Sequence, residues 1–364
     1  MNKMDIRLGN FKTTVAQKRI VNEIIDTGRL TEGKYVKKFE DATARFLDVN
    51  NVVAVSNGTV ALQLVAHFIR QQYPKAKTVC VPAITFPATL NAFEVCGFKT
   101  MLCDIEPNTL CMDINTLTKR QKKKIDVIVP VHLMGYTCDM DNIMEQADKY
   151  NWIVIEDFAE AFGSTYKGKK VGTIGHFGTC SFYVSHILQG GELGIVTTNN
   201  PINAGLLRSM KNHGRIGDLM RFQHGFIGSN YKTTEFCAGI CYIQMKDADK
   251  YIQKRKDNAK YIHDNIKNSN ITGLQVGTNY SVLGYTIKAS SILHKLLACE
   301  KLNSVGIETR EIFPCLAHQP AYKGKFKGYY PIANHIENRC FYIPCHQYLS
   351  KNDLQRIVEG LNDY

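Results

Sequence analysis

The sequence lacks any long hydrophobic run. Its opening, MNKMDIRLGNFKTTV, has no apolar stretch of the kind found in signal peptides, and no segment of the 364 residues approaches the roughly 20 apolar residues that span a bilayer. These absences argue against a secreted or membrane-spanning protein. We therefore expect a cytoplasmic protein that has no membrane partner.

The cysteines lack the spacing of a metal site. Twelve are scattered along the chain. The two most suggestive groupings, Cys237 with Cys241 and Cys340 with Cys345 and His346, do not reproduce the two-pair pattern of zinc or iron–sulfur sites. Cytosolic thiols stay mostly reduced, and buried ones pack as small apolar side chains. We expect no bound metal.

Acidic residues are too few to balance the basic ones. The chain has 45 Lys and Arg against 33 Asp and Glu, which gives a formal net charge of +12. Such an excess favours an anionic partner, either a nucleic acid or a phosphorylated small molecule. The one tight basic run, at residues 122–124, has no interleaved aromatics and is typical of a solvated surface. A nucleotide-linked substrate with a phosphorylated cofactor is therefore favoured over nucleic acid.

Short apolar runs alternate with helical stretches through the first two-thirds of the chain. Helical patterns at 59–70, 87–96 and 139–150 fall between runs that suit strands covered on both faces. This alternation predicts an α/β fold with a mainly parallel sheet flanked by helices, and ligands bind such sheets where strands end. The expected strands lie at 52–55, 78–81, 100–104, 127–131, 152–156, 179–183 and 195–198.

The pattern divides the chain into three parts. Residues 1–30 form an N-terminal segment with an amphipathic helix at 16–27, which we expect to pack near the small domain. Residues 31–240 form the large α/β domain, and residues 241–364 form a smaller C-terminal α+β domain. A helical stretch at 234–268 connects the last two parts.

The segment Ser56-Asn57-Gly58-Thr59 directly follows an expected strand and opens a helix. Glycine lets the backbone approach a ligand closely, and the free N–H groups of a helix N-terminus attract anions. The motif is therefore a candidate phosphate cradle. An ordinary strand-to-helix turn is an equally good reading of these residues alone.

Acidic residues close another expected strand, in the run Glu156-Asp157-Phe158-Ala159-Glu160. A carboxylate at the end of a buried strand is costly unless it meets a cation or a hydrogen-bond donor. Such a group can hold a protonated pyridine nitrogen and make that ring an electron sink. Alternatively, Asp157 caps the following helix.

A glycine-bearing loop follows the strand expected at 179–183, and it contains one histidine, His186. A lone histidine is more often structural than catalytic. The position of His186 in a loop at a strand end favours a functional role, because functional side chains gather at such positions.

Taken in order, these segments resemble the DegT/DnrJ/EryC1/StrS family of sugar aminotransferases and dehydratases, and the resemblance covers nearly the whole chain. It implies a fold-type I enzyme that uses pyridoxal 5′-phosphate or pyridoxamine 5′-phosphate, with a mainly parallel seven-stranded sheet. It also implies a homodimer whose active sites lie at the subunit interface. The resemblance rests on GRLTEG at 28–33, SNGT at 56–59, PAITFPAT at 82–89, PVHLMG at 130–135, EDFAEAFGS at 156–164, SFYVSH at 181–186, NHGR at 212–215, NYKTTE at 230–235, GIETR at 306–310 and HQPAY at 318–322.

The resemblance assigns the cofactor phosphate to the backbone amides of Gly58 and Thr59 and the hydroxyl of Ser181. Asn230 of the partner subunit would join them.

The resemblance assigns the cofactor ring to residues of two other motifs. Phe86 would stack on the pyridine ring, Asp157 would pair with its nitrogen, and Glu160 would lie near its hydroxyl. For Phe86 and Glu160, plain packing or a surface position is the alternative reading.

Position 186 departs from the aminotransferases of the family, which the resemblance implies carry a cofactor-binding lysine there. Imidazole cannot anchor the cofactor covalently, but it moves protons because its pKa lies near neutrality. Histidine at this position is similar to the 3-dehydratase branch, in which non-covalently bound pyridoxamine phosphate removes the C3 hydroxyl of a nucleotide-linked 4-keto-6-deoxyhexose. With Asp157 supporting the ring, His186 is the predicted acid/base residue.

Within that branch the cysteine spacing disfavours the iron–sulfur subtype. It favours the subtype of GDP-4-keto-6-deoxymannose 3-dehydratase, which uses L-glutamate as amino donor. Two alternatives stay open: a nucleotide-sugar aminotransferase whose lysine has been substituted, and a non-catalytic sugar-binding homologue. Arg215, Arg310 and His318 are candidate contacts to sugar or diphosphate, and surface salt bridges explain the two arginines equally well.

Overall fold

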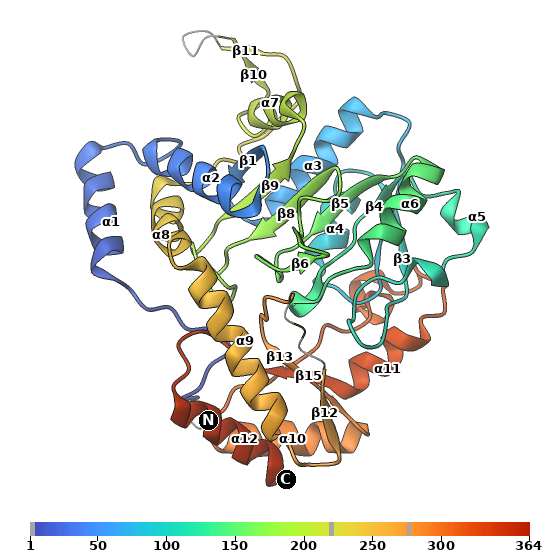
Figure 1. The fold of residues 1–364 in the computed structure, drawn as a ribbon. Helices are drawn as coiled ribbons and strands as arrows, with labels where there is room; N and C mark the ends of the chain where they lie inside the picture. The colour runs from blue at the N-terminus through green and yellow to red at the C-terminus, as the bar shows by residue number, and fades with distance from the viewer. Residues whose placement is uncertain (1–3, 218–221, 275–276, 278) are drawn as a thin grey trace.

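A seven-stranded sheet forms the centre of the computed structural model, which describes residues 4–217, 222–274, 277 and 279–364 (Figure 1). Five neighbouring strands run parallel, and β9 is antiparallel to both of its neighbours. The predicted mainly parallel seven-stranded α/β sheet is therefore confirmed. In spatial order the strands are β1 (Asn51–Val55), β9 (Gly194–Thr198), β8 (Phe177–Ser181), β5 (Ile153–Asp157), β4 (Val127–Ile128), β2 (Thr78–Pro82) and β3 (Lys99–Cys103).

Helices flank this sheet, and apolar runs such as those of β1 and β2 are buried because both faces are covered. Two small hairpins lie outside it, and one of them protrudes beyond α7 (Figure 1). The helices of this part are α2 (Lys34–Leu47), α3 (Gly58–Gln72), α4 (Ala88–Glu94), α5 (Lys119–Lys122), α6 (Met140–Tyr150) and α7 (Pro201–Met210); the hairpins are β6 (Thr165–Tyr166) with β7 (Lys169–Lys170), and β10 (Arg215–Ile216) with β11 (Gln223–His224).

A second, four-stranded antiparallel sheet organises the C-terminal part and has its own hydrophobic core. The predicted helical stretch 234–268 forms two helices, because the backbone leaves the helical conformation at Asp247. The elements are α8 (Glu235–Met245), α9 (Ala248–Asn265), β12 (Ile271–Gly273), β13 (Tyr285–Ala289), α10 (Ile292–Ser304), β14 (Arg310–Glu311), α11 (Pro331–Arg339), β15 (Cys340–Ile343) and α12 (Lys351–Asn362).

The N-terminal segment contacts both parts of the molecule. Ile6 forms a parallel bridge with Ile307 of the C-terminal part, whereas α1 (Val15–Thr27) packs through Ile20 and Ile24 near residues of α8. The predicted boundary at residue 240 falls inside α8. The division of the chain into domains at residues 30 and 240 remains a prediction. No helix among the described residues is long and apolar enough to cross a bilayer.

Glu156, near the end of β5, is fully buried and holds the loop that leads into β8. Its carboxylate accepts hydrogen bonds from the backbone N–H groups of Gly172 at 2.8 Å, Ile174 at 2.7 Å and Gly175 at 2.7 Å. It also contacts Nε2 of His132 at 3.0 Å. Because Nδ1 of His132 accepts from the Cys138 N–H at 3.1 Å, Nε2 carries the proton and donates to Glu156. This carboxylate supports the fold.

We predict that Glu156→Gln lowers the free energy of unfolding by about 3 kcal/mol, because an amide nitrogen would face backbone donors in a buried site. Chemical denaturation measures the change. Glu145→Gln, at an exposed position of α6, is the matched control, and we expect it to change the free energy of unfolding by less than about 0.5 kcal/mol. Equal stability of the two variants would contradict this role.

Candidate active site

A cavity of about 680 Å³ opens where β5 and β8 end and α3 begins. Its position agrees with the rule that ligands bind where strands of an open α/β sheet end. The cavity brings together most of the residues that the sequence predicts for the site. These are Gly58, Thr59, Phe86, Asp157, Glu160, Ser181, His186 and Arg310.

The first turn of α3 forms one end of the cavity. Asn57 caps this helix by accepting from the Val60 N–H at 2.9 Å. Gly58 and Thr59 line the cavity, and their N–H groups belong to the first turn, which has no acceptors within the helix. A Cβ on Gly58 would lie 2.7 Å from Cβ of Ser181, so only glycine lets the helix approach β8 this closely. The Ser181 hydroxyl accepts from the Tyr183 N–H at 3.4 Å, and its own hydrogen remains available to a ligand. These donors fit a phosphate group.

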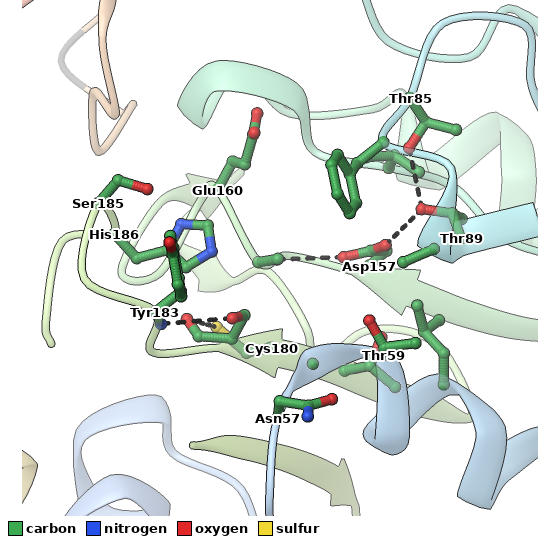
Figure 2. A pocket seen from close by; sticks show the side chains of 18 of the residues that line it. Asn57, Thr59, Thr85, Thr89, Asp157, Glu160, Cys180, Tyr183, Ser185 and His186 are labelled. Carbon is green, nitrogen blue, oxygen red and sulfur yellow. Dashed lines mark hydrogen bonds between the residues drawn. The ribbon is translucent and has the colours of Figure 1, made fainter. Parts of the chain in front are cut away.

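Asp157 lies in the middle of the cavity wall, at the end of β5 (Figure 2). One carboxylate oxygen accepts from the Thr89 hydroxyl at 2.9 Å, and the other accepts from the Ala159 N–H at 3.2 Å. Thr89 in turn receives a hydrogen bond from Thr85 at 2.9 Å. Burial raises the pKa of Asp157, and these donors and His132 only partly oppose that rise. A buried carboxylate without a Lys or Arg partner among the described residues fits a cationic ring nitrogen.

Phe86 and Glu160 flank the same space. The Phe86 side chain is 57% exposed and lines the cavity, which leaves an aromatic face open for stacking on a planar ring. Glu160 accepts from the Met134 N–H at 2.9 Å. Burial raises the pKa of Glu160 to about 7, and the nearby charge of Asp157 adds to this rise.

His186 projects into the cavity from the loop between β8 and β9 (Figure 2). The backbone N–H of His186 donates to the Tyr183 carbonyl at 2.9 Å, which makes a tight turn at this point. Burial lowers the pKa of His186 to about 4, and the positive charge of Arg255 contributes. The imidazole is therefore uncharged at neutral pH. Nδ1 is buried without a partner in the described chain, so we assign proton transfer to Nε2.

Contacts that the sequence did not reveal hold this loop and Asp157. The side-chain amide of Gln244 forms two hydrogen bonds with the backbone of Gln189. The Gln189 N–H donates to Gln244 Oε1 at 3.1 Å, and Gln244 Nε2 donates to the Gln189 carbonyl at 2.5 Å. They are 55 residues apart, and nothing in the sequence connects them. The Thr89 hydroxyl holds Asp157 at 2.9 Å, and its partner Thr85 lies before the start of α4, so no helical spacing in the sequence connects the two threonines.

Three predicted residues do not line this cavity. His318 is paired with Glu337 at 2.6 Å and half-exposed, Arg215 lies on the β10–β11 hairpin over the ring of Phe222, and Asn230 is exposed. The prediction for Asn230 concerned a neighbouring subunit, which a single chain does not test. Of the candidate substrate contacts, only Arg310 on β14 reaches the cavity wall. No group of three or more metal-ligating side chains occurs in the described ranges.

The raised pKa of Glu160 predicts a pH-dependent contribution to the stability of the cofactor-free protein. Because the folded-state pKa of about 7 exceeds the ordinary value of 4.5, the contribution is complete below about pH 4.5 and is lost as pH rises through 7. Glu160→Gln keeps an acceptor for the Met134 N–H but cannot ionise. We expect the native protein to lose about 1 kcal/mol relative to this variant between pH 5.5 and 8. Parallel stability curves from chemical denaturation would refute the assignment.

Comparisons with known proteins agree with this geometry. The profile of the DegT/DnrJ/EryC1/StrS aminotransferase family matches residues 12–362. GDP-perosamine synthase of Escherichia coli O157:H7 is 34% identical over 359 residues, which cover 96% of each chain. GDP-4-keto-6-deoxy-D-mannose 3-dehydratase of Escherichia coli O55:H7 is 28% identical over 360 residues, which cover 92% of this chain and 90% of that protein.

A solved structure of the Escherichia coli 3-dehydratase with bound hydrated pyridoxal phosphate has the same fold. The TM-score is 0.90 at 23% sequence identity, and the match covers 99% of this chain and 100% of the other. The phosphate donors of α3 and Ser181, the exposed Phe86 and the buried Asp157 fit the pyridoxal or pyridoxamine phosphate used by the family. The chain belongs to the DegT/DnrJ/EryC1/StrS family of pyridoxal phosphate-dependent enzymes that modify nucleotide-linked sugars.

Proposed function

We propose that this protein is a 3-dehydratase that removes the C3 hydroxyl of a GDP-linked 4-keto-6-deoxyhexose, with pyridoxamine phosphate as cofactor. One observation carries the proposal: among the described residues that line the cavity there is no lysine, and His186 lines it at the position where the resemblance to the family implies the covalent anchor. A non-covalent cofactor and a histidine base suit loss of water better than transfer of an amine.

The cofactor would be held by the groups already described. The amides of Gly58 and Thr59 and the Ser181 hydroxyl would bind its phosphate, and Asp157 would pair with its ring nitrogen. When bound, the cofactor supplies an amine that condenses with the sugar ketone and a ring that accepts electron density. Thr89 keeps the Asp157 carboxylate aimed at the ring position by its 2.9 Å hydrogen bond.

In this proposal His186 is the acid/base residue that accepts and returns a proton during the reaction. Its imidazole is uncharged at neutral pH because burial lowers its pKa to about 4, so Nε2 has a lone pair ready to accept a proton. Once protonated, the imidazolium is more acidic than usual because its pKa is lowered to about 4, and it can return the proton to a departing hydroxyl. A single histidine therefore acts as base and then as acid.

The nucleotide and the amino donor also belong to the proposal. Both relatives described above are named for GDP-linked sugars, and the net charge of +12 favours a diphosphate ligand. Arg310, which lines the cavity, would contact the diphosphate. We infer that L-glutamate restores the amine of the cofactor after each turnover.

A nucleotide-sugar aminotransferase is the second candidate function. It is favoured by the 34% identity to GDP-perosamine synthase, which exceeds the 28% identity to the 3-dehydratase. The two functions differ in their product: dehydration deletes an oxygen from the sugar, whereas amination places nitrogen on it. A non-catalytic sugar-binding role would leave the nucleotide sugar unchanged.

Mass spectrometry of the product tests the proposal. With pyridoxamine phosphate, L-glutamate and a GDP-linked 4-keto-6-deoxyhexose, we expect a 3-deoxy sugar. We expect His186→Asn to lower turnover by at least about a hundredfold while the cofactor stays bound, because only the proton acceptor is lost. His335→Asn, an exposed histidine on α11, is the control and should match the native rate. An aminated sugar would disprove dehydration.

Borohydride reduction gives an independent measurement. In the presence of pyridoxal phosphate, we expect no covalent adduct on the native protein, because no described lining residue is a lysine. His186→Lys should acquire the adduct at position 186. A lysine adduct on the native protein would favour the aminotransferase candidate.

We also propose a homodimer in which Asn230 of each subunit completes the phosphate site of the other. The residue is exposed and lies outside the cavity of its own chain. His186→Asn and Asn230→Asp should each inactivate the enzyme, and an equal mixture should regain about one quarter of native activity through hybrid dimers with one intact site. Absence of recovery after demonstrated subunit exchange would contradict shared sites.

A further inference from the structure

Residues 6–10, which we call the strap, lead from the C-terminal part of the molecule to the active-site cavity. Ile6 forms a parallel bridge with Ile307, and the Ile6 carbonyl accepts from the Glu308 N–H at 2.9 Å. Two residues later, Leu8 is buried and lines the cavity. The strap therefore connects the C-terminal part to the wall of the site.

The carboxylate of Glu308 fixes the strap through a further contact and also binds a cavity residue. Its Oε2 accepts from the Leu8 N–H at 2.9 Å. Its Oε1 pairs with Nη2 of Arg310 at 3.1 Å, and Arg310 lines the cavity. One carboxylate therefore holds both the strap and the arginine that is a candidate contact to the diphosphate.

Gly9 packs directly against the loop between β8 and β9. A Cβ on Gly9 would lie 3.1 Å from Cα of Ser185 and 3.2 Å from the carbonyl oxygen of Val184, so the two backbones are already in close contact. Val184 and Ser185 immediately precede His186 in the chain. A side chain larger than that of glycine at this position would push the histidine-bearing part of the loop away.

Gln189 joins the strap to the other end of the same part of the loop. This residue is buried, and its Nε2 donates to the Asn10 carbonyl at 3.1 Å and to the Val184 carbonyl. Its backbone is held by the side-chain amide from α8 described above. Residues 184–189, which include His186, are thus held between the strap and α8.

The sheet secures the base of this loop. The Phe182 N–H donates to the Leu193 carbonyl at 2.8 Å, and the Gly190 N–H donates to the Phe182 carbonyl at 2.7 Å. His186 lies four residues from each side of this base, so the contacts with the strap add a support much nearer to the imidazole. Such support matters because a displacement of about 1 Å in a reacting group can cost about a hundredfold in rate.

We propose that the strap is a positioning element of the reaction: Gly9 and Asn10 hold the loop so that His186 faces the cavity, and Glu308 anchors the strap. The purpose of this arrangement rests on the proposed function, in which His186 is the base. The strap places that base and takes no part in the proton transfer.

NMR of isotope-labelled histidine tests the proposal without cofactor or substrate. The variant His186→Gln identifies the signal of His186. Gly9→Val inserts carbon atoms against Ser185, and we expect the His186 signal to shift because the loop must move. Gly205→Val, at an exposed position of α7, is the matched control. A Cβ at this position meets no atom within 4 Å, so the signal should stay unchanged.

Glu308→Ala tests whether the strap acts as a unit. Among the described residues, no hydrogen bond or ion pair joins Glu308 to the loop at 182–193. A shift of the His186 signal in this variant must therefore pass through the strap or through Arg310. Arg310→Ala isolates the second route and should leave the signal unchanged. Glu300→Ala, at an exposed position of α10, is the matched control for loss of a carboxylate.

Gln189→Met is the second variant of the loop contact, because it removes the donor to the Asn10 carbonyl with little change in size. We expect it to shift the His186 signal as Gly9→Val does. An unchanged signal in any folded variant among Gly9→Val, Gln189→Met and Glu308→Ala would overturn the proposal. Failure of all three to fold would also overturn it and leave the strap a purely structural segment.

Steady-state kinetics give a second measurement. We expect Gly9→Val to lower kcat at least about tenfold while KM for the nucleotide sugar and the affinity for pyridoxamine phosphate change by less than about threefold, because the base is displaced and the binding groups are not. A native kcat per folded molecule would contradict the positioning role.

The outcome is separable from that of the proposed function. A shifted His186 signal together with an aminated product would retain the positioning role and reject dehydration. An unchanged signal together with a 3-deoxy product would retain dehydration and reject the role of the strap.

Discussion

The alternation of side chains along β5 is the constraint on which the site depends. Successive residues of a strand point to opposite faces, so the adjacent carboxylates Glu156 and Asp157 serve different ends. Glu156 turns toward the loop at 172–175 and satisfies its backbone donors, whereas Asp157 turns into the cavity and meets the Thr89 hydroxyl. A shift of one residue in this strand would exchange the two roles. It would place the functional carboxylate in the core and leave the loop without its acceptor.

Much of the site was predictable because its residues follow strand ends closely in sequence. Asp157 and Ser181 are the last residues of β5 and β8, and Gly58 and Thr59 follow the end of β1 by three and four residues. Ligand sites of α/β sheets lie where such strands end. Strand boundaries were less certain. The strand expected at 179–183 spans Phe177–Ser181, because pairing with β9 ends at Ser181 opposite Gly194.

The features that the sequence does not predict depend on contacts between distant segments. The amide pair of Gln189 with Gln244 and the seat of Arg255 among Val282, Leu283 and Gln347 join residues far apart in the chain. No local pattern marks such residues, since propensity and periodicity describe only neighbours along the sequence. Likewise, no local pattern indicates that His318 pairs with Glu337.

The environment of position 186 suits more than one chemistry. Burial and the charge of Arg255 disfavour a cation there, and this holds for an ammonium group as it does for an imidazolium. A lysine at this position would therefore be biased toward the neutral amine, which is the nucleophilic form needed for a covalent anchor. A histidine in the same field becomes an uncharged base. Burial at position 186 therefore favours the uncharged form of either side chain.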